Sequence, residues 1–359
     1  MSSSSKTLYI PDTMANWPWP RVMNPYYEEV RAETTAWFHS FKAFSTRSQY
    51  AFDKGNFALL AALTYPKASK EHVRSACDLM NLFFVIDEYT DVEPQPVVRE
   101  MVDIVIDALK NPHKPRPQGE IILGEITRQY WQSAIKLATP TAQRHFKESF
   151  SAYLESLVQQ AEDRDNNTNH SIASYLKHRH ENIGTRPSYA VLEFRLNLPD
   201  EVIYHPTIVK LSEHITELIL LDNDITSYNK EQATGDDSYN ILTVVMRELN
   251  LDLDRAMEWV AEYHAQVQAK FLNGRKQLPS WGADIDRQAE EYLDGLANWA
   301  RGNVCWHFES GRYFGTKSLE VQQTRRVALL PKAVASVQDE SLRRENVVVP
   351  LIEALECKA

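Results

Sequence analysis

The sequence Leu79-Met80-Asn81-Leu82-Phe83-Phe84-Val85-Ile86-Asp87-Glu88-Tyr89-Thr90-Asp91 places acidic residues directly after a long apolar run. Apolar residues before and within this stretch recur at steps of four, three and four, which is the spacing of one helical face. These residues are Val73, Cys77, Met80 and Phe84. The pattern therefore predicts a buried helix whose inward face becomes acidic at its end.

Asp87 and Asp91 continue that same face. Two carboxylates one helical turn apart repel each other by about 3–4 kcal/mol at an effective dielectric constant near 20. A fold that directs both toward its interior has to neutralise them, and divalent cations that prefer oxygen ligands do so. Glu88 points about 100° away from this face, so we expect it to have a structural or supporting role.

A second polar stretch, Asn223-Asp224-Ile225-Thr226-Ser227-Tyr228-Asn229-Lys230-Glu231, follows the apolar residues 218–221. Ile215, Ile219, Asn223, Ser227 and Glu231 are spaced by four, so an amide, a hydroxyl and a carboxylate extend an apolar stripe. Such a ligand set suits Mg²⁺ that keeps some of its water. Asp224 lies off this face and is expected to support it.

Composition favours an all-α fold. The chain has 359 residues, of which 43% are hydrophobic and only 11 are glycine, and its apolar patterns are helical with no succession of hairpin signals. The expected helices span 26–40, 49–64, 70–90, 95–111, 118–137, 141–164, 171–182, 187–194, 200–230, 238–248, 251–272, 283–300 and 302–313.

Three regions follow from this pattern. Residues 1–25, rich in Pro and Trp, are expected to form an N-terminal arm over a helical domain of residues 26–314. Residues 315–359 are expected to form a partly helical C-terminal tail. Nothing in the chain is long and apolar enough to predict a membrane span, and we expect a cytoplasmic protein.

The net charge of −10, from 39 basic and 49 acidic residues, argues against a nucleic-acid partner, which requires a basic surface. Bound cations would supply local positive charge for an anionic small molecule. The three cysteines, Cys77, Cys305 and Cys357, are too few and too scattered to predict a disulfide framework or a zinc site.

The two acidic motifs, in this order and at this separation, resemble those of class I terpene cyclases. The resemblance covers roughly residues 15–315 and implies a single helical bundle around a central apolar cavity. It also implies three Mg²⁺ ions held by Asp87, Asp91, Asn223, Ser227 and Glu231. Within the family the chain looks most similar to basidiomycete sesquiterpene synthases, and among these to Δ6-protoilludene synthases.

Four further residues match diphosphate-binding positions of that family. Arg179 lies in the segment Tyr175–Gly184, 44 residues before Asn223, although the family often has Arg-Arg where this chain has Arg179-His180. Lys230 lies within the second motif, and Arg312 and Tyr313 match a late Arg-Tyr pair.

Aromatic side chains near the motif helices are candidates for stabilising a carbocation, because a desolvated cation–π contact contributes about 2 kcal/mol. The candidates are Phe83, Phe84, Tyr189, Phe194, Trp306 and Phe314; many aromatic residues are ordinary core residues, and we expect about half of these to face a substrate.

The resemblance implies an enzyme, a lyase that ionises farnesyl diphosphate with Mg²⁺. It closes the resulting cation between carbons 1 and 11, through a humulyl cation, to Δ6-protoilludene. Another sesquiterpene product stays open, as does the choice between a monomer and a homodimer.

A chain-elongating prenyltransferase would carry a second D-D-x-x-D motif, and a helical metal phosphohydrolase would carry an adjacent His-Asp pair. A non-catalytic helical binding protein would not need inward-facing carboxylates.

Overall fold

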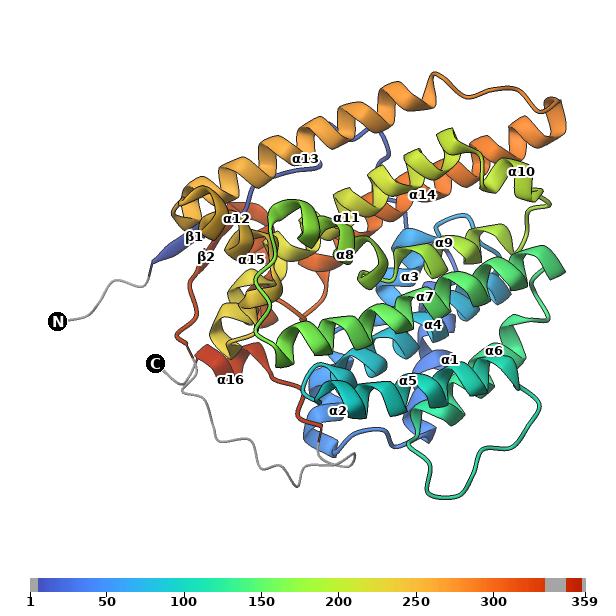
Figure 1. Cartoon of the computed structure of the whole chain (residues 1–359), viewed down its shortest axis with the longest axis horizontal. Helices are drawn as coiled ribbons and strands as arrows, with labels where there is room; N and C mark the ends of the chain where they lie inside the picture. The colour runs from blue at the N-terminus through green and yellow to red at the C-terminus, as the bar shows by residue number, and fades with distance from the viewer. Residues whose placement is uncertain (1–5, 333–346, 357–359) are drawn as a thin grey trace.

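The computed structural model describes residues 6–332 and 347–356, and in these residues it is almost entirely helical (Figure 1). The all-α prediction is confirmed. The helices are α1 (Tyr27–Ser40), α2 (Thr46–Asp53), α3 (Phe57–Thr64), α4 (Lys70–Thr90), α5 (Gln95–Lys110), α6 (Leu123–Ala134), α7 (Pro140–Asp165), α8 (Ile172–Asn182), α9 (Thr185–Glu193), α10 (Asp200–Ile203), α11 (Pro206–Thr234), α12 (Ile241–Leu249), α13 (Leu253–Arg275), α14 (Ala283–Glu309), α15 (Ser318–Thr324) and α16 (Ile352–Glu356).

Two 3₁₀ turns, η1 (Asp237–Tyr239) and η2 (Gly315–Lys317), complete the helical structure. Strands β1 (Thr7–Tyr9) and β2 (Arg326–Ala328) form a short antiparallel ribbon, which the sequence patterns did not predict. In the described residues, no helix is both long and apolar enough to cross a membrane.

Helix α4 begins and ends at the residues that were predicted from the spacing of its apolar side chains. The Ser69 side chain accepts a hydrogen bond from the backbone N–H of His72 and caps the first turn, which satisfies one of the otherwise free N–H groups there. Most of the helix is buried, because its apolar residues are too numerous for a single stripe. The acidic end of the helix therefore continues directly from a segment that is buried in the core.

Three predicted stretches were wrong in the number of helices that they contain, and the predicted helix 118–137 is shorter, spanning Leu123–Ala134. Residues 49–64 form two helices, since Asn56 adopts a left-handed conformation with φ 44° and caps α3. Residues 200–230 are divided by Pro206, whose ring is tolerated only in the first turn of α11. The predicted break near residue 301 is absent, because α14 continues through Gly302.

Gly302 has a packing role. A side chain there would place a Cβ atom 2.7 Å from both the carbonyl carbon and the oxygen of Leu63. The glycine therefore allows α14 to approach the backbone of α3 closely, where the sequence pattern indicated a helix end.

The helices pack around one continuous core. Helix α14 packs against α11 on one side and α3 on another, and α3 packs in turn against α4. Helix α11 also packs against α13, while α7 contacts α5, α8 and α9 (Figure 1). This connectivity relates the two motif helices, α4 and α11, through α3 and α14.

The first described residues lie across α13 and α14. The Trp17 indole donates to the Ala297 carbonyl oxygen at 3.0 Å, and Arg301 donates to the carbonyl oxygens of Met14, Trp17 and Trp19. Near the other end, residues 326–332 run beside α11. Residues 1–5 of the expected arm and residues 333–346 and 357–359 of the expected tail lie outside the described residues.

Candidate active site

The acidic end of α4 is held by two polar neighbours. The Tyr153 hydroxyl, on α7, donates to Asp87 Oδ1 at 2.7 Å, and the Arg312 guanidinium pairs with Glu88 Oε1 at 3.2 Å. Burial raises the pKa of Asp87 to about 6, against the opposing effects of the Tyr153 hydrogen bond and of Arg312. Glu88 therefore orients an arginine, while the Asp87 carboxylate accepts a hydrogen bond from a neutral donor.

Asp91 is the last residue of the motif and caps the C-terminus of α4. The residue is exposed overall, but the protein around its carboxyl group, together with the charges of Asp87 and Glu88, raises its pKa well above the usual range. The spacing of the sequence predicts the repulsion between Asp87 and Asp91, to which Glu88 adds, and a cation would relieve that repulsion.

On α11, Asn223 lies between two of the residues expected to bind diphosphate. The Arg179 guanidinium donates to Asn223 Oδ1 at 3.0 Å, and Asn223 Nδ2 donates to the Tyr313 hydroxyl at 3.1 Å. Arg179 also donates to Asn182 Oδ1 at 2.8 Å. Four side chains, from α8, from α11 and from the segment that follows α14, thus form one connected polar group.

Asp224 supports the polar group of Arg179, Asn182, Asn223 and Tyr313 through its contact with Arg179. Its carboxylate pairs with Arg179 at 3.1 Å, accepts a hydrogen bond from the backbone N–H of Ile241 at 2.9 Å, and is contacted by the Tyr175 hydroxyl. With only 2% of its side chain exposed, Asp224 has its lone pairs committed to protein donors. It supports the arginine, as its off-face position predicted.

Glu231 and Ser227 lie on the next turns of α11. Burial and the charge of Asp224 raise the pKa of Glu231 to about 7, although the Asn240 amide counteracts this rise. Asn240 Nδ2 donates to Glu231 Oε2 at 2.9 Å. Burial and the nearby charge of Arg312 lower the pKa of Lys230, which makes no ion pair with any described residue.

The charges of the two motifs act on each other across the site. Glu88 and Asp91 of α4 favour the charged form of Lys230 on α11. Arg179, which contacts α11, lowers the pKa of Asp87 on α4. Arg312 and Tyr313 are adjacent in sequence and contact Glu88 and Asn223 respectively. The structure therefore brings the two motifs to one polar rim.

Several buried polar atoms of this rim make no hydrogen bond of standard geometry among the described residues: Ser227 Oγ, Arg179 Nε and Arg312 Nε. The Ser227 hydroxyl nevertheless lies close enough to Glu231 to counteract the rise in pKa that burial causes there, and Arg312 lies close enough to Tyr313 to do the same. An unpaired buried polar atom costs free energy, so such atoms indicate a ligand. A hydroxyl among carboxylates fits a divalent cation, and the two guanidinium N–H groups fit an anion such as a diphosphate. The donor set present is consistent with a metal–diphosphate pair.

Three of the six candidate aromatic residues lie beneath the rim. Phe84 stacks on Phe57 with ring centroids 4.0 Å apart, and its ring centroid lies 5.5 Å from that of Trp306. The Arg312 guanidinium lies 4.6 Å above the centre of the Phe84 ring. Phe83 packs edge-on against Tyr153, the donor to Asp87, at 5.0 Å.

The other three candidates pack against different neighbours. Tyr189 is buried beside Thr216, whose hydroxyl donates to the Tyr189 oxygen at 3.3 Å. The ring centroid of Phe194 lies 6.2 Å from that of Phe146 on α7, and Phe314 stacks on Phe308 with ring centroids 5.5 Å apart. Phe314 directly follows Tyr313, the residue that contacts Asn223.

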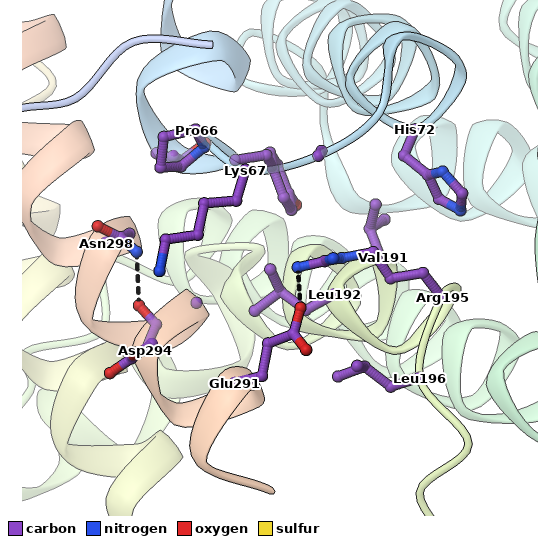
Figure 2. A pocket seen from close by; sticks show the side chains of 14 residues that line it. Pro66, Lys67, His72, Val191, Leu192, Arg195, Leu196, Glu291, Asp294 and Asn298 are labelled. Atoms are coloured by element: carbon purple, nitrogen blue, oxygen red, sulfur yellow. Dashed lines mark hydrogen bonds and ion pairs between the residues drawn. The ribbon is translucent and has the colours of Figure 1, made fainter. Parts of the chain in front are cut away.

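A small pocket lies at the opposite ends of the same helices (Figure 2). It includes His72 near the start of α4, Leu192 on α9 and Asn298 on α14, and its cavity volume is about 40 Å³. Arg195 and Glu291 form an ion pair there. The pocket is remote from the acidic motifs and offers none of their ligands.

Sequence patterns did not indicate Tyr153, Asn240 or His307 as site neighbours. Tyr153 and Asn240 contact Asp87 and Glu231 only through the tertiary fold, and His307 Nδ1 lies 3.2 Å from the hydroxyl oxygen of Thr226. Asn182 had a detectable signal, since it follows Arg179 by three residues, the spacing of neighbours on a helix.

Residues 78–270 match the model of terpene synthase family 2, described as C-terminal metal binding. This match covers both acidic motifs and Arg179. The chain belongs to the terpene synthase family. This family membership makes the protein an enzyme, a terpene cyclase, and confirms the resemblance inferred from the motifs.

Relatives over nearly the full length agree. A protein of Postia placenta named sesquiterpene synthase 14 is 62% identical, with 98% of this chain and 100% of the relative covered. Δ6-Protoilludene synthase 18 of the same fungus is 59% identical, covering 97% and 99%. Δ6-Protoilludene synthase of Armillaria gallica is 51% identical, covering 92% and 96%.

Solved structures share the fold at low sequence identity. A single-substitution variant of cucumene synthase superposes with a TM-score of 0.73 at 21% identity, covering 82% of this chain and 100% of that one. Hedycaryol synthase in complex with HEPES also has a TM-score of 0.73, at 22% identity, covering 84% and 98%. The fold of this terpene synthase is thus the helical terpenoid bundle.

Proposed function

We propose that this terpene synthase is a Mg²⁺-dependent sesquiterpene synthase that converts farnesyl diphosphate to Δ6-protoilludene. The observation that carries the reaction class is the joining of the two motifs at one rim by Arg312 and Tyr313. The names of the relatives support the substrate and the product. Asp87, Asp91, Asn223, Ser227 and Glu231 would hold three Mg²⁺ ions.

When bound, the metal ions would supply Lewis-acid stabilisation of the departing diphosphate. Arg179 and Arg312 present unpaired Nε–H groups to that anion, while Lys230 offers an ammonium group without an ion-pair partner in the described residues. Tyr313 adds a neutral hydroxyl donor. These donors stabilise charge that develops as the carbon–oxygen bond breaks.

Phe84, Phe83 and Trp306 lie on the apolar side of the rim, where a carbocation would form. Their faces attract positive charge without offering a nucleophile. Water would end the reaction early, so aromatic rings are suited to contact a carbocation because they exclude water from it. We propose that the chain of a fifteen-carbon substrate lies against these rings while carbon 1 attacks the distal double bond.

Product analysis tests the proposal. The purified protein is incubated with Mg²⁺ and, separately, with ten-, fifteen- and twenty-carbon allylic diphosphates, and extracts are analysed by gas chromatography–mass spectrometry. We expect Δ6-protoilludene from the fifteen-carbon substrate, and no hydrocarbon from Asp87→Asn or Asn223→Ala. A different sesquiterpene would refute the product, and turnover unchanged in both variants would refute the site.

Chain elongation is the second candidate on this fold. The second motif has Asn223, Ser227 and Glu231 where an elongating enzyme carries aspartates, which disfavours it. Adding isopentenyl diphosphate to the same incubation distinguishes the two reactions, since elongation yields a longer prenyl diphosphate and cyclisation yields hydrocarbon.

A further inference from the structure

A second group of metal-ligand side chains lies outside the acidic motifs, where α7 ends and α8 begins. Asp163, His170 and His178 each direct one ligand atom to a common point, and these atoms lie within 4.8 Å of one another. Asp163 Oδ2 is 3.1 Å from His170 Nε2 and 3.4 Å from His178 Nδ1. None of the three has a role in the proposed cyclisation.

The surrounding residues hold this group as metal ligands are usually held. The Ser174 hydroxyl lies 3.3 Å from His170 Nδ1, which leaves Nε2 directed at Asp163. Gln159 Nε2 donates to the other carboxylate oxygen of Asp163 at 3.3 Å. Arg247 contacts the carbonyl oxygen of His170 and Asn169 Oδ1, which fixes the loop that carries the imidazole.

The separations fit a transition metal better than Mg²⁺. Zinc bonds of 2.0–2.1 Å in a tetrahedron place ligand atoms about 3.3 Å apart, close to both Asp163–imidazole distances. The two imidazole rings lie with their centroids 4.8 Å apart. Nitrogen ligands also favour zinc-like ions, whereas Mg²⁺ prefers oxygen.

The burial of the three side chains and their access to solvent both suit the binding of a metal ion. The exposed fractions of the Asp163 and His170 side chains are 10% and 6%, while that of His178 is 33%. An ion can therefore enter from the His178 side, and three protein ligands leave a fourth position for water.

We propose that Asp163, His170 and His178 bind one divalent transition-metal ion of the zinc type, separately from the Mg²⁺ ions of the acidic motifs. The ion would fasten the end of α7 to α8. His178 directly precedes Arg179, so occupancy of this second site would also restrain the arginine that contacts Asn223.

Cobalt spectroscopy on the untagged full-length chain tests this proposal. Co²⁺ is added at about pH 7.5, where imidazole is a neutral ligand, in the presence of excess Mg²⁺ to occupy the acidic motifs. We expect one equivalent of Co²⁺ to give the visible absorption of a four-coordinate nitrogen–oxygen site, and Zn²⁺ to displace it. The Cys357→Ser background removes the thiol near the chain end as a competing ligand.

Matched variants assign the signal. Zn²⁺ should also raise the melting temperature of the wild-type protein. His170→Ala and His178→Gln should abolish both the Co²⁺ absorption and this rise, whereas Asp87→Asn should retain both. If His170→Ala fails to fold by circular dichroism, His178→Gln decides the result because its side chain is partly exposed. No Co²⁺ binding, or binding that survives both histidine changes, overturns the proposal and leaves Asp163–His170 as a structural hydrogen bond.

Discussion

Asp87 shows how single contacts prepare this site. The Tyr153 hydroxyl donates to the Asp87 carboxylate and counteracts the rise in its pKa that burial causes. Asn240 has the same relation to Glu231. Each neutral donor favours the ionised carboxylate without adding a positive charge that would compete with a metal ion.

Tyr153→Phe removes this donor while keeping the ring that packs against Phe83. We expect the Mg²⁺ concentration for half-maximal activity to rise about fivefold, since one hydrogen bond contributes about 1 kcal/mol. Tyr130→Phe is the matched control, because its buried hydroxyl lies near Ser75 on the first turns of α4 and contacts neither acidic motif. Equal Mg²⁺ titrations of the two variants would contradict this role of Tyr153.

Arg179→Lys tests the planar geometry of the guanidinium. Arg179 reaches Asn182 through one terminal nitrogen and both Asn223 and Asp224 through the other, an arrangement that a single ammonium group cannot reproduce. We expect kcat to fall about 100-fold. Arg186→Lys is the control, since Arg186 makes only an exposed pair with Glu181, and its kcat should be unchanged. A similar kcat in both variants would argue against a role for Arg179.

Among the helices, those predicted best have boundaries that depend on local sequence. The period of residues 73–91 and the Ser69 cap are both local, so the α4 prediction succeeded. The break predicted near residue 301 failed, because the need for Gly302 arises from Leu63, which is far away in sequence. The same reason explains the site: motif spacing predicted Asp87 and Asn223, while Tyr153 and Asn240 are neighbours only after folding.

Gly302→Ala tests the contact between α3 and α14. The new Cβ would lie 2.7 Å from backbone atoms of Leu63, which cannot move without shifting a helix. We expect the free energy of unfolding to fall by about 1–3 kcal/mol, measured by urea denaturation. Gly274→Ala on α13 should be neutral or stabilising, since its Cβ meets only the flexible Leu211 side chain at 3.1 Å and alanine favours helix.

Over the whole molecule, a net charge of −10 coexists with a rim that concentrates Arg179, Lys230 and Arg312. The stability of the entire bundle is also tied to groups in its centre. His307 is fully buried, and burial lowers its pKa from 6.5 to about 4, with Arg312 acting in the same direction and Asp222 opposing it. Its neutral form is therefore part of the folded state.

Lowering the pH should destabilise the protein through His307. Between pH 6.5 and 4 the unfolded chain binds a proton that the folded chain excludes, so the stabilisation is complete above pH 6.5 and is lost as the pH falls. From pH 7 to pH 5 this residue should cost about 2 kcal/mol. Urea denaturation of the wild type and His307→Gln at both pH values measures it; equal losses would exclude the histidine.

The ribbon of β1 and β2 has a mechanical consequence. Thr7 pairs with Ala328, and the Leu329 N–H donates to the Lys6 carbonyl oxygen at 2.8 Å, so two distant parts of the chain are held side by side. The second strand is also tied to α11, because the Asn229 amide donates to the Ala328 carbonyl oxygen at 3.0 Å and accepts a hydrogen bond from the Leu330 N–H at 2.8 Å. Asn229 lies between Ser227 and Glu231, so a tether attached at Leu329 would pull on the second acidic motif, whereas one attached at Lys6 would first load the hydrogen bonds of the ribbon.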